Sequence, residues 1–358
     1  MKVLTIIGAR PQFIKASAVS REMQKADGIA EVIVHTGQHY DPNMSDVFFN
    51  EMEIPKPTYR LETGNLSHGA MTGKMLEGLE EIMQKELPDH VLVYGDTNTT
   101  IAAALAAKKL HISVVHVEAG LRSFNMKMPE EVNRVLTDRI SDILFCPTET
   151  AINNLKAEGF DNFPCKIVRN GDVMQDAAMY YAEKAQEHPG KISEETLDDF
   201  VLCTIHRPEN TDNVENLTAI AEALNKIGLE RKVILPLHPR TRKFLDQHGI
   251  SLKIDVMDPV GYFDMIRLLN HCKLVLTDSG GLQKEAYFFK KNCITIREQT
   301  EWTELVEHGF NLLTGSDANN IYKGYQEMLQ KESDFSVDLY GSGNASGVIV
   351  NTLLGIES

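Results

Sequence analysis

Short runs of apolar residues recur along this chain, and each is followed by a polar or glycine-containing turn and then by residues with helical spacing. The clearest run is Val91–Tyr94, which leads into Gly95-Asp96-Thr97. A second run, Val114–Val117, leads into Glu118. Short apolar strands are typical of a parallel sheet covered on both faces, and strands that alternate with helices imply crossover connections. The sequence therefore predicts an α/β fold.

The strands fall into two series, which predicts two domains. At 358 residues the chain exceeds the size at which one hydrophobic core keeps growing. The first series ends near Asp172, and the second begins at Phe200, after a polar helical segment. We expect two Rossmann-like domains with parallel sheets and a C-terminal helix that packs back on the first domain. The expected ranges are 1–172 for the first domain, 173–343 for the second and 344–358 for the helix.

Composition limits the classes of partner and compartment. The net charge of −15 argues against a nucleic-acid partner, because phosphate backbones require a basic face. The five cysteines are scattered without a C-x-x-C pair, which disfavours a disulfide framework and a zinc site and predicts a reducing cytoplasm. No apolar stretch approaches the length of a membrane span or a signal peptide, so we expect no membrane partner.

The turn after the first strand, Gly8–Gln12, lacks the glycine spacing of a dinucleotide site. A nicotinamide cofactor is therefore not expected, and no motif requires a metal. Arg10 and Lys15 lie near the start of the following helix, where the helix dipole does not favour cations. An anionic ligand explains them better, although two solvated surface cations remain an alternative.

A second turn, Thr277–Glu285, joins a strand to a helix and combines a serine with two glycines. Ser279, Gly280 and Gly281 would expose backbone N–H groups at a helix start and let a phosphate approach closely. Glu285, one turn further along the helix, could accept hydrogen bonds from ribose hydroxyls. A glycine pair alone is a weak signal, because ordinary loops also use it.

Two histidines follow strands of the second series. His206 follows the strand that ends at Ile205, and His238 follows the next strand along the chain. The carboxyl ends of parallel strands border the ligand crevice, so both are candidate donors to a phosphate or a sugar. A packed or surface role for His238 is an equal alternative.

Three carboxylates form the most informative set in the chain. Asp96 and Glu118 end buried strands, where an unpaired carboxylate is costly, and Glu130 lies in the first turn of a helix that Pro129 begins. Acids that converge in a cleft repel one another, which would raise at least one pKa and place an acid beside a base. Glu130 and Arg134 are four residues apart, so a simple helical ion pair is the alternative for those two.

Together these residues resemble the non-hydrolysing UDP-N-acetylglucosamine 2-epimerase family over essentially the whole chain. The family's fold is the GT-B architecture, two Rossmann-like domains with the active site in the cleft between them. The segments that carry the resemblance are Gly8–Lys15, Thr36–His39, Gly95–Thr97, His116–Arg122, Pro129–Arg134, His206–Asn210 and Asp278–Glu285.

The resemblance implies reversible C2 epimerisation of a UDP-2-acetamido sugar, by elimination of UDP and its re-addition, with no cofactor. It assigns catalytic positions to Asp96, Glu118, Glu130 and His206. It assigns substrate-binding positions to Arg10, Lys15, Gln38, Arg134, His238, Ser279, Gly280, Gly281 and Glu285. The partner it implies is a UDP-sugar, and a homodimer is expected because members of the family are commonly dimers.

Departures from the family pattern indicate a branch. Gln12 replaces a glutamate, which would remove a repulsion if the substrate carried its own carboxylate. The loop Gln38–Met44 departs from the segment that receives an activating second UDP-sugar, which puts that activation in doubt. With Leu121–Met128, His206–Asn210 and Thr300–Thr303, these variants resemble the branch acting on UDP-2,3-diacetamido-2,3-dideoxyglucuronate, and UDP-N-acetylglucosamine is the alternative substrate.

Other classes share parts of this pattern. A retaining GT-B glycosyltransferase would share the Ser279–Glu285 nucleotide loop, but it has no need for three acids around C2. A silent UDP-sugar sensor would bind nucleotide without releasing UDP, and a hydrolysing epimerase would release free sugar. The complete acidic set favours the non-hydrolysing epimerase.

Overall fold

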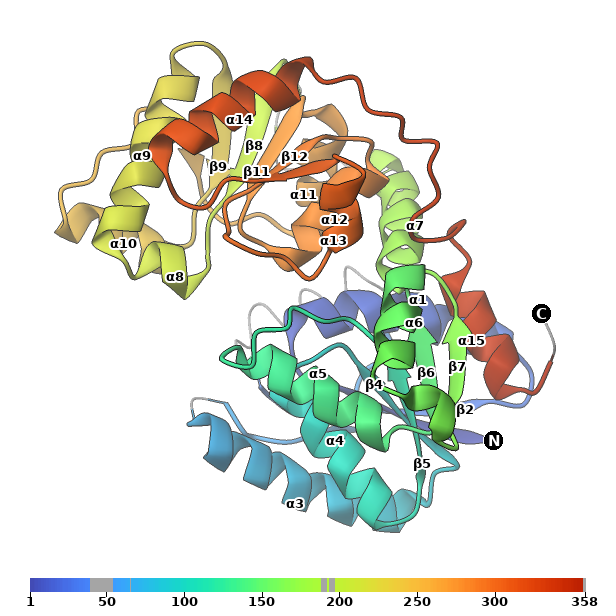
Figure 1. Cartoon of the computed structure of the whole chain (residues 1–358). Coiled ribbons are helices and arrows are strands. Elements are labelled where there is room, and N and C mark those ends of the chain that lie inside the picture. Colours follow the sequence, from blue (N-terminus) through green and yellow to red (C-terminus); the bar gives the residue numbers. More distant parts are fainter. Residues whose placement is uncertain (39–53, 65, 188–191, 193–196, 357–358) are drawn as a thin grey trace. The chain divides into compact units, whose positions relative to one another are not determined.

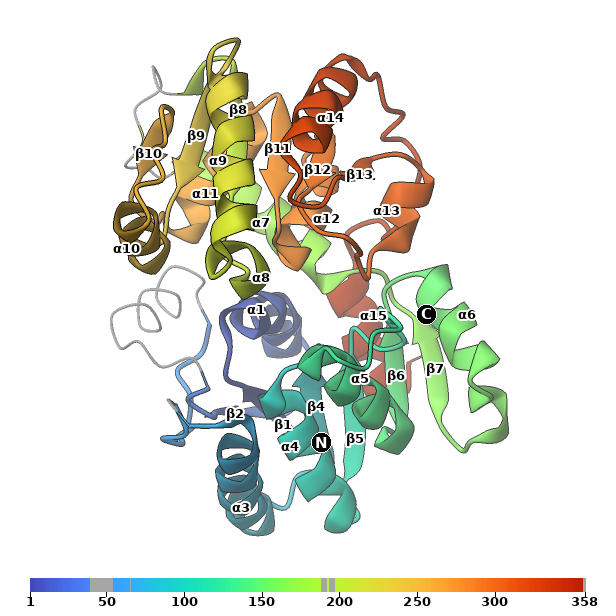
Figure 2. The same cartoon turned by 60° about the vertical axis from the view of Figure 1, so that its left-hand side comes forward.

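The computed structural model describes residues 1–38, 54–64, 66–187, 192 and 197–356, except the side chains of Arg10 and Glu187. The chain forms two compact units (Figures 1 and 2). The first comprises residues 1–177 and 338–358, and the second comprises residues 178–337. The two units therefore divide after residues 177 and 337, and the boundaries expected from the sequence were residues 172 and 343. No helix in the described part of the chain is long and apolar enough to cross a membrane.

The first unit is built on a parallel sheet whose strands occur in the order β3-β2-β1-β4-β5-β6-β7. Its inner strands are short and almost wholly buried, which explains why they appear in the sequence as apolar runs. The strands are β1 (Lys2–Ile7), β2 (Ala30–His35), β3 (Tyr59–Arg60), β4 (His90–Tyr94), β5 (Ser113–Val117), β6 (Ile143–Cys146) and β7 (Lys166–Arg169).

Helices cover both faces of this sheet. Side chains of α3 and α4 form one core with alternate residues of β1, β4 and β5, and on the other face α1 and α15 contact each other. The C-terminal helix thus packs within the first unit (Figure 1). The helices are α1 (Arg10–Lys25), α3 (His68–Glu86), α4 (Asn98–Lys109), α5 (Pro129–Ile140), α6 (Glu149–Ala157), η1 (Phe160–Asn162), α7 (Val173–Glu187), which continues into the second unit, and α15 (Ala345–Leu353).

The second unit repeats the plan with a parallel sheet in the order β10-β9-β8-β11-β12-β13. One core lies between the sheet and α9 and α14, and another lies on the side of α11 and α12, so this sheet is also covered on both faces. Its strands are β8 (Phe200–Thr204), β9 (Lys232–Pro236), β10 (Asp255–Met257), β11 (Leu274–Thr277), β12 (Cys293–Thr295) and β13 (Asn311–Leu313). Its helices are α8 (Pro208–Thr211), α9 (Val214–Gly228), α10 (Pro239–Gln247), α11 (Tyr262–His271), α12 (Gly280–Phe288), α13 (Thr303–Glu307) and α14 (Ala318–Gln330).

Both sheets have a point where the strand order reverses. In the first sheet it lies between β1 and β4, and in the second it lies between β8 and β11. Loops at such a point diverge and leave a crevice at the carboxyl ends of the strands, where ligands bind in open α/β sheets. The predicted fold class, two parallel α/β domains, is confirmed. Several candidate site residues lie in the loops that follow these strands.

Candidate active site

Gln12 ties together the two turns at the reversal point of the first sheet. Its side chain is 1% exposed. Its Oε1 accepts hydrogen bonds from the Gly8 and Ala9 N–H groups at 2.9 and 3.1 Å, and its Nε2 donates to the Tyr94 carbonyl at 2.9 Å. The expectation that Gln12 relieves repulsion of an acidic substrate is therefore not supported, because the amide faces the protein and is fully used there.

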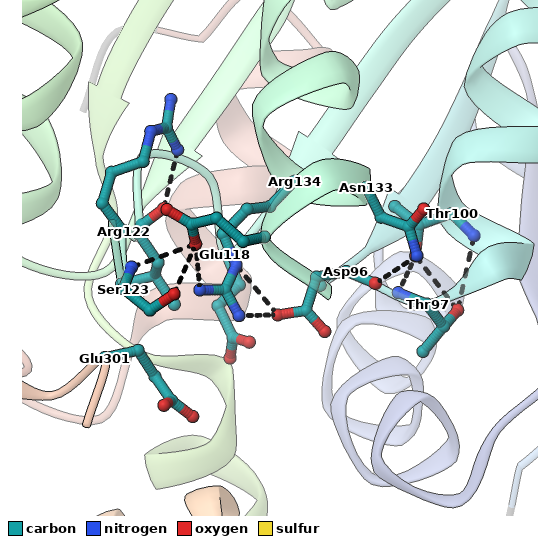
Figure 3. A network of polar contacts seen from close by, with 12 residues as sticks. Asp96, Thr97, Thr100, Glu118, Arg122, Ser123, Asn133, Arg134 and Glu301 are labelled. Carbon is teal, nitrogen blue, oxygen red and sulfur yellow. Dashed lines mark hydrogen bonds and ion pairs between the residues drawn. The ribbon is translucent and has the colours of Figure 1, made fainter. Parts of the chain in front are cut away.

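Asp96 lies in a turn whose backbone carbonyls are held by side chains. Gly95 adopts a left-handed φ of 61°, and its carbonyl accepts a hydrogen bond from His116 Nε2 at 2.8 Å. The next carbonyl, that of Asp96, accepts one from Asn133 Nδ2 at 2.9 Å. The Asp96 carboxylate pairs with Arg134, through Nε at 3.1 Å and Nη2 at 2.5 Å (Figure 3). The turn and the carboxylate are thus fixed from outside the loop.

Glu118 is the first residue after β5. Its φ of 71° lies in the left-handed region, which is strained for a residue with a side chain and is enriched at functional sites. Its carboxylate lies 2.5 Å from Lys15 Nζ, and both side chains are buried. A Cβ atom placed on Gly95 would lie 3.2 Å from Lys15 Nζ and 3.6 Å from Glu118 Oε1. The turns after β4 and β5 therefore meet around this ion pair.

Helix α5 supplies the remaining charged groups of the first unit. Glu131, Arg134 and Asp138 recur at helical spacing and are all buried. Glu131 accepts hydrogen bonds from the Ser123 and Phe124 N–H groups at 3.0 and 2.8 Å, and its other partner is Arg134 Nη1 at 2.7 Å. It therefore holds the loop that precedes the helix.

Glu130 differs from the other acids. Its side chain is partly exposed, and it forms no hydrogen bond or ion pair with the residues that the structure describes. The ion pair that helical spacing suggested with Arg134 is absent, because Arg134 faces Asp96 and Glu131 instead. Convergent acids were expected to repel one another, but the structure pairs Asp96 and Glu118 with a cation each. Of the three candidate acids, Glu130 alone is left with an unpaired carboxylate among the described residues.

In the second unit, Asp278 orients His206. Asp278 is fully buried after β11, and its carboxylate lies 3.0 Å from His206 Nδ1. It also accepts hydrogen bonds from the backbone N–H groups of His206 and Arg207. Burial alone would raise the pKa of Asp278, but the hydrogen bond and charge of His206, followed by the Arg207 N–H, outweigh burial and lower it. The half-exposed imidazole is thus fixed through Nδ1, which leaves Nε2 for a ligand.

The start of α12 has the features of an anion site. Ser279 is the N-cap residue, and its hydroxyl accepts a hydrogen bond from the Leu282 N–H at 3.4 Å. A Cβ atom placed on Gly281 would meet no atom within 4 Å, so the space beside that residue is open. The first N–H groups of a helix have no acceptor within the helix, and they attract anions. Glu285 is buried, and the Tyr262 hydroxyl donates to it at 3.0 Å.

Two predicted binding residues serve as helix caps. The ring of His238 accepts a hydrogen bond from the Arg240 N–H at 3.2 Å, so His238 caps α10. Gln38 Oε1 accepts one from the Thr99 N–H at 3.0 Å in the first turn of α4, so it caps that helix. Arg10 is the first residue of α1, but its side chain lies outside the described part. Residues 39–53, which include most of the expected activator loop, also lie outside it.

The groups that hold these turns in place were not predicted from the sequence. They are Gln12 as a bridging residue, His116, Glu131, Asp138 and Asp278. Polar residues at buried positions were the available signal, since His116 interrupts an apolar strand and Asp138 continues the buried face of α5. The part of the chain that the structure describes contains no cluster of three histidine, cysteine or acidic residues that could hold a metal ion.

We predict that Gln12→Glu lowers the free energy of unfolding by about 1–3 kcal/mol at pH 7, because a carboxylate oxygen would replace the amide that donates to the Tyr94 carbonyl. The loss should shrink at acid pH, where a protonated carboxyl can donate again. Urea denaturation at several pH values measures both effects. Gln24→Glu, at an exposed position on the same helix, is the control, and equal stability of the two variants would contradict the bridge.

Comparisons with known proteins show the family to which this chain belongs. The family model for UDP-N-acetylglucosamine 2-epimerase matches residues 21–354. The UDP-2,3-diacetamido-2,3-dideoxy-D-glucuronate 2-epimerase of Pseudomonas aeruginosa is 55% identical over 99% of both chains. The UDP-N-acetylglucosamine 2-epimerase of Methanocaldococcus jannaschii, solved with UDP-GlcNAc and UDP, superposes with a TM-score of 0.90 at 42% identity, over 99% of this chain and 100% of that chain. The predicted 2-epimerase class is thus confirmed, and the chain belongs to the UDP-N-acetylglucosamine 2-epimerase family.

Proposed function

We propose that this protein reversibly epimerises C2 of a UDP-2-acetamido sugar, and that its substrate is UDP-2,3-diacetamido-2,3-dideoxyglucuronate. The observation that carries the proposal is the 55% identity, over 99% of both chains, to the Pseudomonas aeruginosa enzyme of that name. The UDP-N-acetylglucosamine 2-epimerases of Methanocaldococcus jannaschii and Neisseria meningitidis are 43% and 34% identical. UDP-N-acetylglucosamine is therefore the alternative substrate.

The chemistry explains why such a site needs several acids and cations. The C2 proton of a 2-acetamido sugar is not adjacent to a carbonyl, so direct deprotonation is too difficult. Removal of that proton while UDP leaves C1 gives a 2-acetamidoglucal, and re-addition of UDP with a proton on the other face completes the inversion. The two faces require two proton-handling groups, and the departing diphosphate requires positive charge or N–H donors.

In this proposal Asp96, Glu118 and Glu130 exchange the C2 proton, and His206 assists departure of UDP. The contrast among the acids supports a division of labour. Asp96 lies against Arg134 and Glu118 lies against Lys15, so each of these carboxylates is held in place by a cation. Glu130 has no cationic partner among the described residues, which leaves its carboxylate available to a substrate.

The remaining candidates are proposed to bind substrate. The start of α12, with Ser279, Gly280 and Gly281, would receive the diphosphate through N–H groups, and Glu285 would contact the ribose. Arg10, Lys15 and Arg134 would supply positive charge. In Gln38 and His238 the capping hydrogen bonds use Oε1 and Nδ1, respectively. The Gln38 amide nitrogen and His238 Nε2 would therefore bind the substrate.

The proposed reaction predicts deuterium exchange. In deuterated water, proton NMR should show loss of the C2 proton together with a manno-configured product, faster from UDP-2,3-diacetamidoglucuronate than from UDP-N-acetylglucosamine. Faster turnover of the latter would overturn the proposed substrate but keep the epimerase. Nucleotide binding without exchange on either sugar would overturn the epimerase, and sugar transfer to an acceptor would then indicate a glycosyltransferase.

Substitutions of the adjacent residues Glu130 and Glu131 should separate an effect on catalysis from an effect on stability. We predict that Glu130→Gln lowers kcat by about 10²-fold or more with little change in the melting temperature, because this carboxyl is proposed to move a proton. Glu131→Gln should lower the melting temperature, because it weakens the hydrogen bonds to Ser123, Phe124 and Arg134. Steady-state kinetics and calorimetry of both variants check this, and a fully active Glu130→Gln would remove that residue from the mechanism.

Gly281→Ala tests the anion site without harming the fold. The new methyl group would meet no protein atom within 4 Å, and alanine is a better helix former, so stability should stay equal or rise by about 0.5–1 kcal/mol. Affinity for UDP should fall by about tenfold or more, because the methyl group occupies the space where a phosphate approaches. Titration calorimetry measures it, with Gly73→Ala, an open position on α3, as the control. Unchanged UDP affinity would contradict the assignment.

We propose that the protein works in the cytoplasm as a homodimer. The five free cysteines, four of them buried, support a reducing compartment. The homodimer rests on the family resemblance, and the mass of the purified protein by light scattering would check it.

A further inference from the structure

His116 is a fully buried histidine in the middle of the apolar strand β5, and both of its ring nitrogens have partners. Nε2 lies 2.8 Å from the Gly95 carbonyl, and Nδ1 lies 2.7 Å from Asp138 Oδ1. A carbonyl oxygen can only accept, so Nε2 carries a proton and donates it. The ring thus connects α5 to the turn after β4, and none of the proposed catalytic roles uses it.

Asp138 anchors this histidine and is also fully buried. Its Oδ2 accepts hydrogen bonds from the Gly120 N–H at 3.1 Å and from Arg122 Nη1 at 2.7 Å. Burial would raise the pKa of Asp138, but His116 and then Arg122 outweigh burial and lower it. The ionised carboxylate can only accept, so Nδ1 of His116 also donates. Asp138 therefore holds the turns after both β4 and β5, the first through His116 and the second directly.

The Gly95 carbonyl matters because it controls the next residue. That carbonyl belongs to the same planar peptide group as the Asp96 N–H, so fixing its direction fixes the start of Asp96. Gly95 has no side chain to restrict its backbone dihedral angles, and it adopts a left-handed conformation. Hydrogen bonds from other residues must therefore hold this peptide group in place. The flanking carbonyls of Tyr94 and Asp96 are held by Gln12 and Asn133. His116 holds the middle of the three.

We propose that His116 is a positioning residue, which acts through the Gly95 carbonyl to hold the Asp96 carboxylate in its reactive orientation. The proposal rests on the proposed function, since it requires that Asp96 handles a proton of the sugar. Loss of the hydrogen bond would let the Gly95 peptide rotate and displace Asp96, whose carboxylate would still bind Arg134. A displacement of about 1 Å at a reacting group costs on the order of 10²-fold in rate.

Two variants separate the hydrogen bonds from the charge. His116→Phe removes both donors. Asp138→Asn can keep every partner, because its amide nitrogen would donate to Nδ1 while its oxygen accepts from Gly120 and Arg122. His116 would then stay neutral and still donate from Nε2 to Gly95. We expect kcat to fall about 10²-fold in His116→Phe, with KM changed less than about threefold, and to stay within about threefold of wild type in Asp138→Asn.

His90→Phe is the matched control. His90 is a partly buried histidine at the opposite, amino-terminal end of β4, so the same substitution there should change stability without changing kcat. If His116→Phe does not fold, the wild-type protein still tests the geometry. Nitrogen-15 NMR of labelled histidine should show one ring whose Nε2 carries a slowly exchanging proton, and absence of that Nε2–H would overturn the proposal.

The remaining outcomes are also decisive. A folded His116→Phe with kcat within threefold of wild type overturns the positioning role, and so does an Asp138→Asn that loses as much activity as His116→Phe. Wild-type protein that exchanges no C2 proton on either UDP-sugar rejects the proposed function instead. The two failures are therefore distinguishable.

Discussion

The buried charged face of α5 is the constraint on which the first unit's site depends. A helix that turns Glu131, Arg134 and Asp138 toward a sheet requires a partner for every charge, because an unpaired buried ion costs several kcal/mol. The partners come from the turns that follow β4 and β5. Burying this face of α5 therefore also fixes these turns, and Asp96 takes its position from its ion pair with Arg134.

The two parallel sheets explain why chemistry gathers at these turns. Strands buried on both faces are closed to a ligand along their length, so the residues just after β4, β5, β8 and β11 are the first that can meet one. At Glu118 the chain also accepts a left-handed backbone, a strain that is kept only where the surroundings determine it. The Lys15 ammonium and the turn at Gly95 supply those surroundings.

Much of the fold could be predicted from the sequence, because buried strands leave a direct trace as short apolar runs. Asp96 and Glu118 were also predictable, since each ends such a run. Partners of these groups were not predictable from local spacing. The i, i+4 rule suggested a Glu130–Arg134 pair, but Arg134 binds Asp96, which is distant in sequence and fixed only by the fold.

Roles of amide and imidazole side chains were the least predictable. Gln12 was expected to relieve repulsion of a substrate carboxylate, whereas its amide bridges two turns inside the protein. Gln38 caps a helix that lies 61 residues further along the chain, whereas His238 caps the helix that directly follows it. Asp278 was recognised only as part of a glycine-rich loop, although it orients His206. Except for the local cap at His238, each of these roles depends on contacts between segments that no short window of sequence contains.

The measurement that tests this account most directly is positional isotope exchange. The sugar nucleotide would carry oxygen-18 in the bridge between C1 and the β-phosphorus, and phosphorus-31 NMR would follow the label during turnover. Elimination of UDP frees that oxygen to rotate among the β-phosphoryl positions, so the account predicts that label moves to non-bridging positions as the C2 epimer forms. Epimerisation that leaves the label in the bridge would contradict it, because the C1–O bond would then never have broken.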